Sequence, residues 1–225
     1  MERLSIGLIG WGTVGSALGE LVRTGPLPIN LASVAVRNRE RPELPKGVEI
    51  GGPEAALEAD VVVELAGGID GPLGWARLAL DRGTPYVTAN KALLATHGRE
   101  LADLAERRVA ALLGSASVGG GTPMIETVQH LAATGEIERI RGVVNATTTY
   151  ILSAMGDGRS YEEALREAQD AGYAEADPSF DIDGRDAGVF RVSGPGAGGR
   201  PTGGAVYADL ARLVNGERPI LFGAR

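Results

Sequence analysis

The sequence predicts an α/β fold: a doubly wound parallel sheet, then a second, truncated α+β domain, and a C-terminal helix that returns to the first domain. Three observations support this prediction. Short apolar runs alternate with helical patterns in the first half of the chain, a glycine-rich turn joins the first strand to the first helix, and the pattern changes past residue 120. We place the domains at 1–125, 126–192 and 193–225.

The first domain is predicted from strands and helices that alternate at a regular spacing. The strand-like runs occupy residues 3–9, 31–37, 61–66, 85–90 and 108–114. Helical patterns occupy residues 13–23, 74–83 and 98–108. This alternation indicates βαβ units, in which the strands run parallel and helices cover the sheet.

The second half of the chain mixes helical and strand-like patterns. The helix-like segments are 122–134, 150–155 and 160–172, and the strand-like segment is 139–146. Residues 205–214 predict an amphipathic closing helix, because Val206, Leu210 and Val214 are spaced four apart. The glycine-rich joint before it, 192–205, suits either a linker or backbone packed closely against a ligand, and composition leaves both open.

Composition excludes several classes of partner and site. The net charge of -7 argues against binding to nucleic acid, which requires a basic surface. The absence of cysteine excludes disulfides, thiolate zinc sites and cysteine nucleophiles, and neither His97 nor His130 is given a role. No segment has the apolar length of a membrane span or a signal peptide, so we expect a cytoplasmic protein with a small-molecule partner.

The turn after the first predicted strand has the pattern G-x-G-x-x-G, from Gly10 to Gly15. Gly10 permits a tight turn, Gly12 lets a pyrophosphate approach the backbone, and Gly15 lets helix and strand pack closely. The phosphates would lie at the helix N-terminus, with Thr13 and Val14 in its first turn. A glycine turn without a ligand is the alternative, but a strand before the motif and a helix after it favour dinucleotide binding.

The end of the second predicted strand indicates which dinucleotide is used. NAD-selective sites place an acid there, about 20 residues beyond the motif, to bind the ribose 2′-hydroxyl. This chain has Arg37-Asn38-Arg39 instead. Arginine suits a 2′-phosphate, so NADP(H) is favoured, and Glu40 leaves use of NAD(H) open.

Two further features suggest a substrate site. Lys91 follows a predicted strand at the sheet edge where ligands collect, so its ammonium could contact cofactor or substrate, although an isolated lysine more often lies on the surface. The segment 172–187 carries five carboxylates after a helix, and clustered acids can hold a cationic amino group. Its spacing does not match a calcium-binding EF-hand. The five are Glu175, Asp177, Asp181, Asp183 and Asp186.

Six motifs together resemble the homoserine dehydrogenases, in that family's order. They are GWGTVG (10–15), VTANK (87–91), SASVGGGTP (115–123), GVVNATTTYIL (142–152), the acidic block with its preceding helix (163–187) and GPGAGGRPT (194–202). The resemblance implies a Rossmann-type cofactor domain. It also implies interconversion of L-homoserine and L-aspartate 4-semialdehyde by hydride transfer with NAD(P)H, in threonine and methionine biosynthesis.

The resemblance also implies roles for individual residues. Lys91 would lie near nicotinamide and substrate and, with Asp186, act in catalysis. Glu175, Asp181 and Asp186 would bind the amino-acid substrate. The cofactor-binding set would be Gly10, Gly12, Thr13, Val14, Gly15, Arg37, Lys91, Gly172 and Gly196. A monovalent cation such as Na+ would be held by the backbone carbonyls of Ser115, Val118, Gly120 and Thr122.

The chain departs from the family's pattern in one decisive place. The family's D-A-x-x-K motif has a lysine that donates or relays the proton to the carbonyl oxygen, and here that position is Phe190. Residues 188–191 then pass almost directly into the GPGAG motif, so a domain's worth of chain is missing. The missing part includes strands through which family members dimerise, which leaves a homodimer uncertain. Smaller departures are Ser115 for Glu, Ala146 for Gly and Thr149 for Asn.

Three interpretations follow from the sequence. The first is a working homoserine dehydrogenase, whose missing part is dispensable or supplied by another chain. The second is a non-catalytic NADP(H)-binding remnant of that family. The third, a dehydrogenase of similar layout for another amino acid, is disfavoured by the acidic block and VTANK together.

Overall fold

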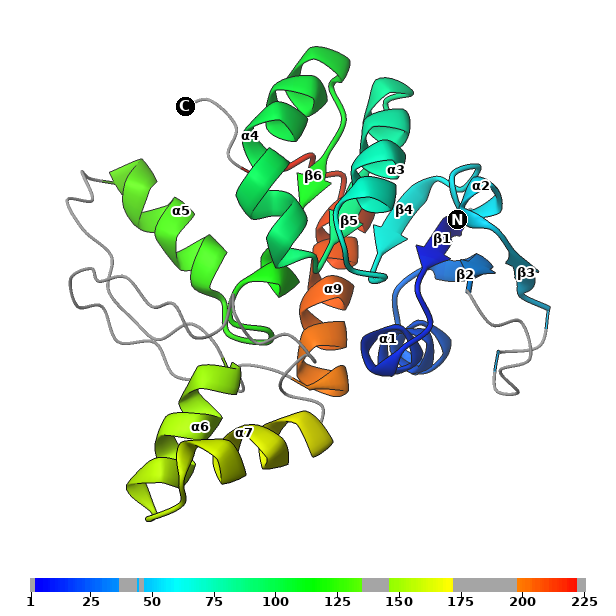
Figure 1. Ribbon diagram of the computed structural model, residues 1–225. Coiled ribbons are helices and arrows are strands. Elements are labelled where there is room, and N and C mark those ends of the chain that lie inside the picture. Colours follow the sequence, from blue (N-terminus) through cyan, green and yellow to red (C-terminus); the bar gives the residue numbers. More distant parts are fainter. Residues whose placement is uncertain (1–2, 37–43, 45–46, 135–145, 172–197, 222–225) are drawn as a thin grey trace.

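The computed structural model describes residues 3–36, 44, 47–134, 146–171 and 198–221. Its centre is a six-stranded parallel sheet in the order β3-β2-β1-β4-β5-β6 (Figure 1). The strands are β1 (Leu4–Ile9), β2 (Ile29–Ala35), β3 (Glu49–Gly51), β4 (Val61–Glu64), β5 (Tyr86–Thr88) and β6 (Leu112–Leu113). The predicted doubly wound α/β sheet is confirmed, since the chain proceeds outward from β1 in both directions.

Helices cover both faces of this sheet (Figure 1). They are α1 (Thr13–Thr24), α2 (Pro53–Ala56), α3 (Asp70–Asp81), α4 (Lys91–Arg108) and α9 (Gly199–Val214). A short 3-10 helix, η1 (Ser115–Ser117), follows β6 and leads to α5 (Met124–Thr134). Helices α6 (Ala146–Gly156) and α7 (Tyr161–Asp170) form a pair of their own below the sheet domain in the figure.

The two faces follow from the alternation of side chains along each strand. In β4, Val62 belongs to the apolar cluster formed with α2, α3 and α4, whereas Val61 and Val63 belong to the cluster formed with α1 and α9. Tyr86 and Val87 divide in the same way. Because both faces are covered, the central strands are mostly apolar, as expected for a parallel sheet.

The closing helix α9 returns to the first domain and packs on α1, in agreement with the predicted fold. Its Val206, Leu210 and Leu213 enter the same apolar cluster as Leu18 of α1. The chain after α9 then lies beside β6, where Leu112 N–H donates to Pro219 O at 3.0 Å and Leu221 N–H to Leu112 O at 2.8 Å. The C-terminal segment is therefore part of the cofactor domain's core.

Several predicted boundaries were wrong, and local hydrogen bonds explain the largest error. The helix predicted over 98–108 begins at Lys91, because the Asn90 side chain accepts a hydrogen bond from Leu93 N–H at 3.1 Å and caps it. The helix predicted over 74–83 begins at Asp70. The strand predicted over 108–114 is reduced to Leu112–Leu113, since α4 continues to Arg108.

The glycine-rich joint is another correction. Helix α9 begins at Gly199, so residues 199–204 are helical rather than linker, and packing on α1 outweighs the low helix propensity of glycine. Strand β3 and helix α2 were not predicted. The predicted strand over 139–146 lies outside the described residues, apart from Ala146, which starts α6.

No helix in the described part of the chain is both long enough and apolar enough to cross a membrane.

Candidate functional site

The glycine turn at the carboxyl end of β1 has the geometry that its sequence predicts. Gly10 adopts φ +106°, a region that L side chains rarely adopt. A Cβ atom at Gly10 would lie 2.7 Å from the carbonyl carbon of Leu65, so the turn passes directly against the segment after β4. Both observations require glycine at this position.

The N-terminus of α1 is built to face a ligand. A Cβ atom at Gly15 would lie 2.3 Å from Gly10 O, so the first turn of the helix is pressed onto the glycine turn. Gly12, the N-cap, has no atom within 4 Å of its Cβ position and supplies no side-chain cap. The helix has no acid in its first turn. The N–H groups in the first turn of a helix lack acceptors within the helix, and open space in front of them suits the pyrophosphate of a dinucleotide.

Helix α9 brings a second N-terminus to the same place. A Cβ atom at Gly199 would lie 2.7 Å from Thr13 O, and one at Gly203 would lie 3.1 Å from Leu18 N. The two helices therefore touch backbone to backbone at their first turns. The part of the glycine-rich segment that the structure describes is thus packed beside the predicted cofactor turn.

Lys91 lies at the same edge of the sheet as the glycine turn. It is the first residue of α4, directly after the carboxyl end of β5, and it is exposed. The strand ends are joined by backbone hydrogen bonds from Leu65 N–H to Ile9 O at 2.8 Å and from Ala89 N–H to Glu64 O at 3.3 Å. The glycine turn and Lys91 therefore lie at the same edge of the sheet, after strands β1 and β5 that β4 separates.

Sequence reasoning missed the acid at the end of β4. Glu64 is fully buried, and its Oε1 accepts hydrogen bonds from Ala66 N–H at 2.7 Å and Gly67 N–H at 2.9 Å. Its Oε2 accepts from the Thr88 hydroxyl at 2.7 Å. A carboxylate at the end of a wholly apolar strand was the available signal, because buried acids persist only where donors surround them.

A second group of acids lies beyond β6 and was also missed. The Ser115 hydroxyl is within hydrogen-bond distance of Glu126 Oε1 and of Asp209 Oδ1, the latter at 2.7 Å, and Ser115 N–H donates to Asp209 Oδ2 at 3.2 Å. Burial raises the pKa of Asp209 to about 6, the bonds from Ser115 oppose this, and the nearby Glu126 charge adds to it. Glu126 Oε2 is buried without a hydrogen-bond partner.

The four residues predicted to bind a cation lie in the segment 115–122, which begins with the Ser115 that both acids contact. Ser115, Gly120 and Thr122 are buried, and Val118 is half-buried. The Thr122 carbonyl accepts a hydrogen bond from Met124 N–H at 2.7 Å. Within the described residues, no three His, Asp or Glu side chains gather as a metal site.

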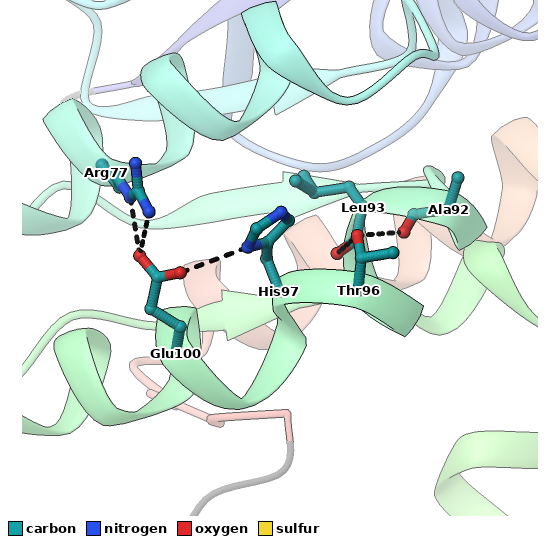
Figure 2. A network of polar contacts seen from close by, with 6 residues as sticks. All are labelled: Arg77, Ala92, Leu93, Thr96, His97 and Glu100. Atoms are coloured by element: carbon teal, nitrogen blue, oxygen red, sulfur yellow. Dashed lines mark hydrogen bonds and ion pairs between the residues drawn. The ribbon is translucent and has the colours of Figure 1, made fainter.

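His97 takes part in a surface network between α3 and α4 (Figure 2). Its Nδ1 lies 3.2 Å from Glu100 Oε2, and Glu100 Oε1 accepts a hydrogen bond from Arg77 Nε at 2.6 Å. The network ties the two helices together on their exposed side, which agrees with giving His97 no catalytic role.

The remaining predicted site residues lie outside the described residues. They are Arg37, Gly172, Glu175, Asp181, Asp186 and Gly196, together with the departure at Phe190.

Two family models match most of this chain in sequence. The NAD-binding domain of homoserine dehydrogenase matches residues 10–113, and the homoserine dehydrogenase model matches residues 123–191. Homoserine dehydrogenases of Synechocystis sp. and Corynebacterium glutamicum are both 38% identical to the chain, over 94% and 82% of its length. The chain belongs to the homoserine dehydrogenase family.

The chain spans about half the length of the curated relatives it matches, with 52% of the Synechocystis protein and 44% of the Corynebacterium protein covered. The crystal structure of a homoserine dehydrogenase from Thiobacillus denitrificans is 35% identical, with a TM-score of 0.73 over 81% of this chain and 46% of that one. A hyperthermophilic archaeal homoserine dehydrogenase in complex with NADPH shares the fold, with 23% identity and a TM-score of 0.78.

Family membership gives the glycine turn its ligand class. Residues 10–113 match a domain that binds a nicotinamide dinucleotide, and this range holds the glycine turn, Glu64 and Lys91. The second match ends at residue 191, next to Phe190. The segment between the two matches, 114–122, contains η1 and all four of the predicted cation-binding carbonyls.

Proposed function

We propose that this chain catalyses the NAD(P)-dependent interconversion of L-homoserine and L-aspartate 4-semialdehyde. The observation that carries the proposal is the placement of Lys91 and the open glycine turn at one edge of the sheet, in a chain of the homoserine dehydrogenase family. The cofactor supplies the hydride when it is bound. The chain must supply binding, orientation and a positive charge or proton at the carbonyl oxygen.

The N–H groups at the start of α1 bind the cofactor phosphates, which are anionic and suit a helix N-terminus. Lys91 stabilises the negative charge that develops on the substrate oxygen during reduction. Its charge is the more important because Phe190 provides no proton at the position where the family has lysine. Glu175, Asp181 and Asp186 hold the ammonium group of the amino-acid substrate.

The test is NADPH oxidation with L-aspartate 4-semialdehyde, measured together with NADPH binding by fluorescence on the same sample. We expect turnover in the wild-type protein and none above background in Lys91→Ala. Lys46→Ala, which removes the other lysine of the sequence, is the matched control and should retain activity. Undiminished turnover in Lys91→Ala would refute the role given to Lys91.

Phe190 and the shortened chain favour a second candidate, a cofactor-binding remnant without catalysis. The same assay separates the two functions. NADPH binding without turnover supports the remnant, whereas turnover that requires Lys91 supports the enzyme.

For the cofactor we propose a preference for NADP(H), because Arg37 and Arg39 suit a 2′-phosphate. Arg37→Glu should weaken NADPH binding more than NADH binding, as measured by fluorescence titration with each nucleotide. An equal effect on both nucleotides would argue against a contact with the 2′-phosphate.

We also propose that a monovalent cation such as Na+ binds at the carbonyls of Ser115, Val118, Gly120 and Thr122. The buried, unpartnered Glu126 Oε2 on the adjoining helix supports this, because an uncompensated carboxylate oxygen favours a nearby cation. Replacing Na+ by choline should lower the melting temperature of the wild-type protein. Glu126→Gln should reduce that difference, and equal melting in both salts would oppose a cation site.

A further inference from the structure

We propose that Glu64 is a positioning residue: it holds the loop 65–68 against the glycine turn and, through Thr88 and Asn90, fixes the start of the helix that carries Lys91. The inference rests on the proposed function for its effect on turnover. Its effect on nucleotide binding depends only on the cofactor domain.

Glu64 fixes the loop 65–68 through one of its carboxylate oxygens. Both N–H groups that Glu64 Oε1 accepts belong to this loop, so one carboxylate oxygen fixes two consecutive peptide units. The loop continues through Gly67 and Gly68, which adopt φ +72° and +80° and have no atom within 4 Å of their Cβ positions. It is therefore an exposed turn, placed against Gly10 and held from beneath by a buried charge.

Glu64 is also connected, through Thr88 and Asn90, to the start of the helix that carries Lys91. The Thr88 hydroxyl donates to Glu64 Oε2 and accepts from Asn90 N–H at 3.0 Å. The Asn90 side chain donates to Gly68 O at 2.7 Å and caps α4 through Leu93 N–H. These bonds form a closed ring that runs from Glu64 through the loop to Asn90 and back through Thr88.

The ring has a physical consequence for the site. Glu64, Thr88 and Asn90 are buried, so the bonds among these three residues are shielded from exchange with water, while the loop that they hold is exposed. The loop beside the glycine turn and the residue before Lys91 therefore cannot shift independently. Charge stabilisation and hydride transfer both require such fixed relative positions, because small displacements of reacting groups cost large factors in rate.

The decisive variant breaks the ring at its bridge and leaves the loop bonds in place. Thr88→Val removes the hydroxyl at nearly constant volume. Glu64→Gln keeps one acceptor oxygen for the loop, and its amide can donate to the Thr88 hydroxyl, so this variant reverses the bridge instead of breaking it. Thr88→Ser should restore the bridge. Thr96→Val is the control, because it removes a threonine hydroxyl from α4, the helix that carries Lys91, and this hydroxyl donates only to Ala92 O and Leu93 O within the helix (Figure 2).

We expect Thr88→Val to lower kcat about tenfold or more, with the Kd for NADPH changed less than about threefold. Glu64→Gln should lower kcat less than Thr88→Val does, because a bridge of reversed direction remains. Thr88→Ser and Thr96→Val should stay within about twofold of wild type in kcat. Wild-type kcat in Thr88→Val would overturn the proposal.

A binding measurement keeps this inference separate from the proposed activity. Glu64→Asp withdraws the carboxylate from the loop by one methylene, and we expect it to weaken NADPH binding about fivefold or more, equivalent to losing one hydrogen bond. If the wild-type protein binds NADPH without turnover, the proposed activity fails, and this arm still decides the role of Glu64. An unchanged Kd in Glu64→Asp would then reject it.

Discussion

Two buried acids occupy comparable places at the carboxyl ends of strands, yet their surroundings differ. Glu64, after β4, is 0% exposed and receives three donors for its two oxygens. Asp209 of α9, beside the end of β6, is 1% exposed and shares one hydroxyl, that of Ser115, with Glu126. A hydroxyl has one proton, so it cannot donate to both acids at once.

The surroundings of Glu64 and Asp209 show two ways in which this fold accommodates a buried acid. At Glu64 the donors outnumber the acceptor oxygens, and the carboxylate organises the loop around it. At Asp209 acceptors outnumber donors, which agrees with the raised pKa of Asp209. The first acid is a fixed structural anchor, and the second makes stability depend on pH.

Removal of the Glu64 carboxylate should lower the free energy of unfolding more than the other substitutions. Glu64→Ala leaves the Thr88 hydroxyl buried without an acceptor and removes the acceptor of two backbone N–H groups in the exposed loop, and we expect a loss of about 3–5 kcal/mol in the free energy of unfolding. Urea denaturation without cofactor measures it. A loss below about 1 kcal/mol would mean that water replaces the carboxylate, and that Glu64 is not an anchor.

Asp209→Asn should change the free energy of unfolding in the opposite direction and increase it. The amide can accept from Ser115 N–H and donate to the Ser115 hydroxyl, which is then free to donate to Glu126, so every donor has an acceptor. We expect the variant to be about 1–3 kcal/mol more stable than wild type at pH 8.

The stability of the wild-type protein should depend on pH, and the direction of that dependence follows from the pKa of Asp209. Burial raises the folded-state pKa of Asp209 to about 6, above its ordinary value of 3.8, so the folded state binds the proton more tightly than the unfolded state. Stability therefore falls as pH rises from about 4 to about 6, and the penalty is complete above that range. Urea titrations in choline buffer should show this fall in wild type and not in Asp209→Asn. Parallel curves would contradict the assignment.

The smallest effect comes from an exposed acid that resembles Glu64 in its bonding. Asp60 Oδ2 accepts from Ser5 N–H at 2.8 Å and from the Ser5 hydroxyl at 2.6 Å, and these bonds lower the pKa of Asp60. Its contribution is present at neutral pH and lost as pH falls below about 4. Asp60→Asn should cost less than about 1 kcal/mol at pH 7, measured by urea denaturation, because water competes for the same donors. A loss as large as that of Glu64→Ala would show that burial is not what separates the two acids.

Much of the cofactor domain could be predicted from the sequence because its signals are local. The β-branched runs and the glycine pattern specify strand, turn and helix through backbone sterics, and β1, α1 and β4 lie close to where they were expected. The helix at Lys91 began earlier than predicted because its start depends on the side chain of Asn90. Alternating strands and helices also fixed the parallel sheet, and so placed Lys91 near the glycine turn.

Contacts between segments that are distant in sequence depend on the tertiary structure and not on local sequence patterns. Ser115 and Asp209 are brought together only because α9 returns to pack on α1, and the Glu64 ring closes only because β4 and β5 are neighbours in the sheet. Helix α9 could begin within a glycine-rich segment for the same reason, since packing supplied the stability that propensity lacked. Motifs report the local conformation a residue needs, whereas the balance of donors and acceptors around a buried charge depends on which strands and helices become neighbours.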